Sequence, residues 1–123
     1  HELAHFKGFM RENEANFISY ITCVNSGIDE FAYSGTMLAY IHATNALYKI
    51  NSDKYYQIQS LLSSDVLADI KANNDYFNKR QGVASKVSKT VNNTYLKSNN
   101  QKSGVASYGE MVDLLIAYYQ SLQ

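Results

Sequence analysis

Apolar side chains recur along the chain every three or four residues, the spacing that gathers them on one face of an α-helix. Alternation with a period of two, which would indicate strands, is almost absent. The runs with helical spacing are Phe17, Ile21 and Val24; Met37, Ile41 and Tyr48; Ile58, Leu61 and Leu62; Val66, Ile70 and Phe77; Val83, Val87, Val91 and Tyr95; and Val112, Leu115, Ile116 and Tyr119. The pattern predicts an all-α fold, a compact bundle of about six helices.

Turn-forming residues lie between these runs and mark where helices are expected to end. They are Gly8 and the segments 25–30 (NSGIDE), 51–53 (NSD), 63–65 (SSD), 80–82 (RQG) and 97–104 (KSNNQKSG). Ser107 and Glu110 have the S-x-x-E spacing of a capping box, in which the two side chains bond backbone N–H groups at a helix start. The last helix is therefore predicted to begin there. No internal repeat divides the chain, and residues 1–123 are interpreted as a single domain.

Charge and cysteine content narrow the function classes. The 11 lysine and arginine residues equal the 11 aspartate and glutamate residues, so no basic surface for nucleic acid or an anionic membrane is expected. Cys23 is the single cysteine, which excludes an intramolecular disulfide. Residues 31–48 carry no charge, but their polar side chains favour a helix buried in protein over one that spans a bilayer. The chain itself is therefore expected to be soluble.

The first five residues, HELAH, have the pattern H-E-x-x-H. Residues four apart share a face of a helix, so the imidazoles of His1 and His5 can converge on one Zn²⁺ ion at about 2.0 to 2.1 Å. Glu2 then lies beside the metal, where its carboxylate suits a general base that takes a proton from zinc-activated water. This is the chemistry of amide hydrolysis, and Glu2 is the expected catalytic residue.

A catalytic zinc usually has three protein ligands and one open position, so a third ligand is required. Gly8 can adopt a positive φ without steric cost, end the first helix and let the chain turn back. The second helix then offers Glu12 and Glu14, which lie about 200° apart around a helix axis and cannot both face one ion. Glu12 shares its face with Asn16, whose amide could hydrogen-bond a ligand imidazole. Glu12 is therefore favoured as the ligand, with Glu14 as the alternative and Asn16 as a supporting residue.

Residues 1–17 resemble the active-site segment of zincin metallopeptidases of the gluzincin type, in which a second helix with the pattern E-x-x-A-D or E-x-x-A-N supplies the glutamate ligand. Glu12, Ala15 and Asn16 match that pattern. The segments HELAHFKGFMRENEANF, YSGTMLAYIHATNALYKI and SYGEMVDLLIAYY together resemble an uncharacterised family of bacterial multi-pass membrane proteins, in which a membrane anchor precedes a zincin-like domain. The resemblance implies a membrane-associated zinc metallopeptidase whose peptide or protein substrate is unknown.

The resemblance also implies an upstream sheet, because zincins place a strand and its sheet before the H-E-x-x-H helix. The chain is accordingly interpreted as the helical part of such a domain, with residues 1–17 forming the metal-site helices and residues 18–123 the helical core. We expect this part alone to bind zinc weakly or not at all and to be inactive, since a ligand at His1 has no preceding helical turn to hold it.

Two other functions are compatible with the same residues. In the first, a regulatory domain senses zinc and cleaves nothing. In the second, the histidines and acids are the polar end of a metal-free helical interaction module. Three further side chains are interpreted structurally: His42 as a hydrogen-bonded interior residue, Tyr108 as an amphipathic residue at the core margin, and Arg11 as a surface charge that could pair with Glu14.

Overall fold

The structure, a computed structural model, describes residues 1–80 and 110–123 of the chain. These residues form the helices α1 (Glu2–Phe6), α2 (Glu12–Val24), α3 (Asp29–Ile50), α4 (Ser52–Gln59), α5 (Ser64–Arg80) and α7 (Glu110–Ser121). No strand occurs in either described range, so the all-α prediction is confirmed there. The predicted helical run from Val83 to Tyr95, the turn at 97–104, Ser107 of the capping box and Tyr108 lie outside the described residues.

The helix ends follow the turn chemistry of the sequence. Gly8, after α1, and Gly27, after α2, have φ values of +98° and +72°, a region that other residues rarely adopt. The side chain of Asn51 accepts the backbone N–H of Lys54 at 2.9 Å and caps the start of α4. The hydroxyl of Ser63 accepts the N–H of Val66 at 3.4 Å, at the start of α5. The helix ends are therefore set by local features of the sequence: glycines that adopt a positive φ, and polar side chains that cap the next helix.

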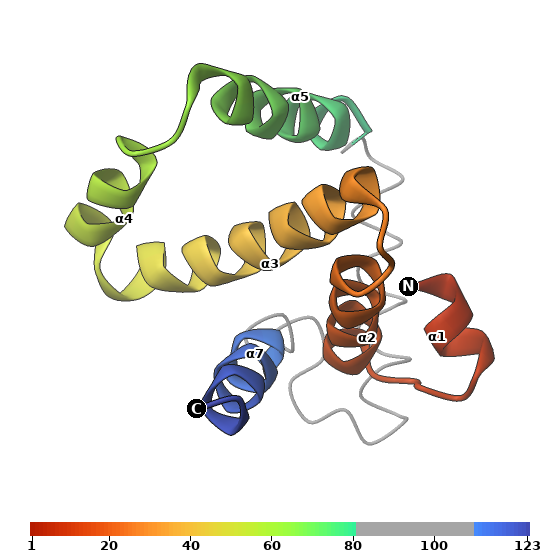
Figure 1. Cartoon of the computed structure of the whole chain (residues 1–123). Coiled ribbons are helices and arrows are strands. Elements are labelled where there is room, and N and C mark those ends of the chain that lie inside the picture. The colour runs from red at the N-terminus through yellow and green to blue at the C-terminus, as the bar shows by residue number, and fades with distance from the viewer. Residues whose placement is uncertain (81–109) are drawn as a thin grey trace.

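The core lies where α2, α3 and α7 meet. Its buried residues are Tyr20, Met111 and Leu115, and the partly buried apolar residues packed against them are Phe17, Ile21, Val24, Leu38 and Ala39. Figure 1 shows α2 between α1 and α7, with α3 crossing above α2 and α7, and α5 returning along the side of α3 that faces away from α2. The ring of Tyr48 meets those of Tyr55 and Tyr56 at centroid distances of 5.1 and 6.2 Å, which joins α3 to α4. Among the described helices, none combines the length and the apolar character that spanning a lipid bilayer requires.

Gly35 allows α2 and α3 to approach each other closely. It is buried in α3, and a Cβ atom built there would lie 2.7 Å from Cβ of Cys23 and 3.3 Å from the carbonyl oxygen of Tyr20. A separation of 2.7 Å between two carbon atoms is well inside van der Waals contact. The glycine is therefore a packing residue, and its place in the middle of a helix follows from the neighbouring helix.

We predict that Gly35→Ala destabilises the protein by about 1 to 3 kcal/mol, because the added methyl overpacks the α2–α3 contact. At an exposed helical site the same change would stabilise the fold by about 1 kcal/mol, so the sign of the effect is diagnostic. Urea denaturation measures it. In a Cys23→Gly background, which removes the clashing Cβ, the loss should shrink. An equal loss in both backgrounds would contradict this packing argument.

A pair of tyrosine hydroxyls links α2 to α7. The hydroxyl of Tyr20 is hydrogen-bonded to that of Tyr119, 99 residues away along the chain. Tyr20 is only 5% exposed. Burial, followed by the hydrogen bond with Tyr119, raises the pKa of Tyr20 from 10.0 to about 12. Both causes favour the neutral phenol in the folded state, since a buried phenolate would lose its hydration.

This pKa predicts a loss of stability in alkali. Because the folded-state pKa is raised, the contribution of Tyr20 is fully present below about pH 10 and is lost as the pH rises to about 12, an effect of roughly 2 kcal/mol. Denaturation midpoints measured from pH 9 to pH 12 test it. Tyr20→Phe should flatten the decline, and Tyr119→Phe should flatten it partly, because the burial of Tyr20 remains. The prediction fails if all three proteins lose stability equally.

Candidate metal centre

The two histidines of the H-E-x-x-H pattern lie one turn apart: His1 is the N-cap residue of α1, and His5 lies within the helix. The carbonyl oxygen of His1 accepts the N–H groups of Ala4 and His5 at 2.9 and 3.3 Å, so helical bonding begins at the first residue. The rings of His1 and His5 meet edge to face, with centroids 4.6 Å apart. Their Nε2 atoms are 3.1 Å apart. The spacing of the sequence thus brings both nitrogens to one point, as the helical period requires.

Glu12, the first residue of α2, completes a group of three. Its Oε2 lies 3.3 Å from Nε2 of His1, and its Oε1 lies 3.4 Å from Nε2 of His5. The link between α1 and α2 contains Gly8, whose positive φ turns the chain back. Ala4, the buried residue of α1, has the smallest side chain that a helix can present to a neighbour without using glycine. α1 therefore packs close to α2.

The three side chains have the spacing of metal ligands. A tetrahedral ion with bonds of about 2.0 to 2.1 Å holds its ligand atoms about 3.3 Å apart. The observed separations are 3.1, 3.3 and 3.4 Å. Charge-assisted N–H···O bonds are shorter, at about 2.7 to 2.9 Å, so a proton shared between an imidazole and the carboxylate accounts less well for the two longer separations. The donor set of two imidazoles and one carboxylate is also one that zinc takes.

The three side chains of the group are partly exposed to solvent. The exposed fractions are 31% for the His1 side chain, 25% for His5 and 23% for Glu12. Solvent, an ion or a substrate group can therefore reach the three ligand atoms. In the described part of the chain, these residues form the one group of three or more histidine, cysteine or acidic side chains close enough to hold a metal ion.

Glu14 is directed away from the imidazoles. Its Oε1 lies 3.6 Å from Nη1 of Arg11 in an ion pair on the other side of α2, as the angle of about 200° between residues 12 and 14 requires. The structure therefore gathers Glu12, and not Glu14, beside His1 and His5. The pairing of Arg11 with Glu14, which the sequence analysis allowed, is observed.

The outer nitrogen of His5 has a partner that the sequence analysis missed. Nδ1 of His5 lies 2.7 Å from the backbone carbonyl oxygen of Phe9. Asn16, which was expected to support a ligand imidazole, is buried in α2. In the part of the chain that the structure describes, it makes no hydrogen bond with His1 or His5. A backbone carbonyl leaves no trace in the side-chain pattern, so the sequence contains no direct signal for this contact; Gly8 indicates only that the chain turns there. The supporting role of Asn16 stays a prediction.

Glu2 is exposed in the first turn of α1. No ion pair or hydrogen bond with another described residue involves its carboxylate, which leaves it accessible to water.

His42 is not part of the centre: it lies on α3 and, with residues such as Tyr33, Met37 and Asp69, lines a separate cavity of about 620 Å³.

Over residues 1–116, the chain matches a family described as "Protein of unknown function (DUF3810)". It belongs to this family. The part of the chain that matches the DUF3810 family includes Glu2, the three clustered residues and the first half of α7. Comparisons with curated proteins and with solved structures found no match.

From the geometry of the candidate centre we predict that zinc affinity depends on the carboxylate of Glu12 and not on that of Glu14. Glu12→Ala should weaken zinc binding by roughly 100-fold or more, since a direct ligand is expected to matter at least as much as the groups that support it. Glu14→Ala, on the same turn of α2, should leave the affinity nearly unchanged. Competition with a chromophoric chelator measures both. Equal losses, or no loss in either variant, would remove Glu12 from the centre.

Proposed function

We propose that this chain contains the zinc centre of a metallopeptidase of the zincin type, which hydrolyses peptide bonds with metal-activated water. The observation that carries the proposal is the convergence of His1, His5 and Glu12 at separations of 3.1 to 3.4 Å. Two imidazoles from an H-E-x-x-H helix and a glutamate from the next helix are the ligand set of the gluzincin type, which the sequence resembles.

Each residue has a distinct part in this chemistry. His1, His5 and Glu12 would hold the ion, and their partial exposure would leave it accessible to water and substrate. When bound, zinc acidifies water and polarises a carbonyl oxygen. Glu2, exposed between the two histidines in sequence, would accept the proton of the attacking water and pass it to the nitrogen of the leaving amine. Its carboxylate needs no partner in the resting protein, which agrees with its exposure.

The proposal assigns this activity to the full-length protein and to a membrane-associated setting. The support for that setting is the resemblance to bacterial multi-pass membrane proteins, and the support for a peptide substrate is the H-E-x-x-H chemistry itself. A regulatory domain that senses zinc would use the same three ligands but would have no need of Glu2. The role of Glu2 therefore separates the two functions.

We predict that Glu2→Gln in the full-length protein retains zinc but lowers peptide turnover by about 10² to 10⁴, the usual contribution of a general base. Glu14→Gln is the matched control and should retain both. Zinc content is measured by elemental analysis, and turnover with a library of quenched fluorescent peptides. Zinc without turnover in the unmutated protein would favour the sensor, and absence of zinc would favour the metal-free interaction module.

A further inference from the structure

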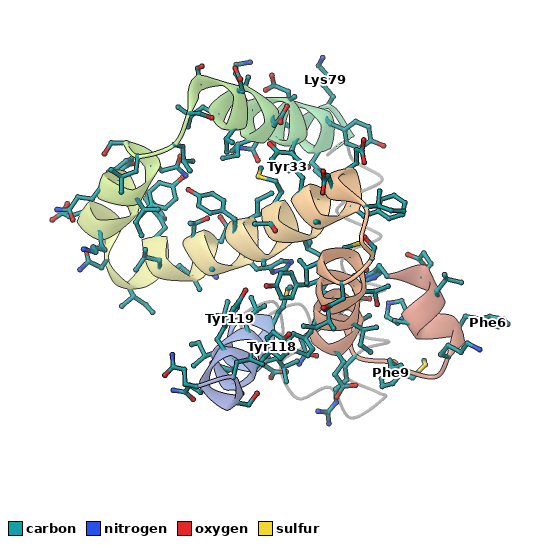
Figure 2. All side chains as sticks on the ribbon, in the orientation of Figure 1. Phe6, Phe9, Tyr33, Lys79, Tyr118 and Tyr119 are labelled. Carbon is teal, nitrogen blue, oxygen red and sulfur yellow. The ribbon has the colours of Figure 1, made fainter. Side chains whose placement is uncertain are left out.

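We propose that the turn formed by Gly8 and Phe9 is a positioning device for His5, which fixes its ring so that Nε2 faces the metal position. This inference rests on the proposed zinc site. It concerns the backbone carbonyl of Phe9, to which neither the sequence pattern nor the family description gives a part in metal binding. Figure 2 shows Phe9 on the link between α1 and α2, with Phe6 pointing away from the rest of the molecule.

The backbone of this turn is closed by two hydrogen bonds. The N–H of Gly8 donates to the carbonyl of His5 at 3.0 Å, and the N–H of Phe9 donates to the carbonyl of Ala4 at 3.1 Å. This is the pair of bonds of a Schellman motif, which ends a helix on a residue with positive φ. Gly8 supplies that residue, with φ +98°. The amide of Phe9 is thereby tied to α1.

The carbonyl of the same residue then bonds the side chain of His5. A carbonyl oxygen can only accept, so Nδ1 of His5 must carry the hydrogen in the 2.7 Å contact with Phe9. In a neutral imidazole with its hydrogen on Nδ1, the lone pair lies on Nε2. Nε2 is the atom that lies 3.4 Å from Glu12 and 3.1 Å from His1. The turn thus selects the tautomer of His5 that can bind a metal.

This arrangement makes His5 the anchored ligand of the pair. Metal-bound histidines commonly donate their other N–H to a carbonyl or carboxylate, and loss of that partner typically weakens metal binding by about 10 to 100-fold. No described residue forms a corresponding hydrogen bond with Nδ1 of His1. The ring of His1 is instead held by its edge-to-face contact with His5. A rotation of the His5 ring away from this orientation would therefore displace both imidazoles.

The chain offers a matched control for this device. Gly8 and Gly27 both have a positive φ, and an added Cβ at either position would meet nothing within 4 Å. Gly8→Ala and Gly27→Ala therefore impose the same kind of backbone strain, without a steric clash in either case. Only Gly8 precedes a carbonyl that bonds a candidate ligand. Gly8→Asn is a conservative variant, since Asn tolerates positive φ better than Ala.

The experiment compares zinc affinity and the tautomer of His5 in the 123-residue chain. Gly8→Ala should lower zinc affinity by about 10 to 100-fold, Gly8→Asn should restore much of it, and Gly27→Ala should lower thermal stability while leaving the affinity unchanged. Imidazole ¹⁵N NMR of the zinc-free proteins should show hydrogen on Nδ1 of His5 in the unmutated chain and in Gly27→Ala, and a mixture of tautomers in Gly8→Ala.

The two readouts separate this inference from the proposed function. If the unmutated chain shows the Nδ1–H form while neither it nor the full-length protein binds zinc, the proposed function fails and the positioning of His5 stands. If Gly8→Ala binds zinc as Gly27→Ala does and retains the Nδ1–H form, the positioning device is overturned whether or not the protein is a peptidase.

Discussion

The candidate centre depends on the helical state of α1, because His1 and His5 share a face only while the turn between them is formed. α1 has five residues, far fewer than the dozen or more that an isolated helix needs to be stable in water. Its stability must therefore come from outside the segment, from its packing on α2 and from the closed turn at Gly8. A bound cation would add to this, since ligands brought together by an ion hold their backbone together as well.

α2 links this short helix to the rest of the molecule. Its first residue, Glu12, belongs to the candidate metal centre, whereas Tyr20, two turns further along, belongs to the core with Met111 and Leu115. One helix thus carries a candidate ligand at its first residue and buried aromatic packing two turns further along. Because α2 packs against α3 and α7, these contacts set the position of Glu12. The candidate centre therefore depends on contacts between residues that are distant in the sequence.

Much of this could be predicted from the sequence, because it follows from local rules. The helical period placed His1 and His5 on one face, the angle between residues 12 and 14 separated Glu12 from Glu14, and Gly8 marked the end of α1. The features that were missed depend on three-dimensional proximity. Gly35 became a packing residue because Cys23 lies against it. The carbonyl of Phe9 was invisible to side-chain patterns, since every residue has a carbonyl and its direction depends on backbone angles.

The arm formed by α4 and α5 differs from the rest of the fold in how it is held. α4 contains no buried residue, and neither do residues 64–79 of α5. A hydrogen bond of 2.6 Å from the hydroxyl of Tyr33 to Asp69 joins α5 to α3. Segments with few buried contacts open at lower free energy than the global unfolding transition. Amide hydrogens in this arm should therefore exchange with solvent through separate local openings, while those around Met111 exchange only when the whole core unfolds.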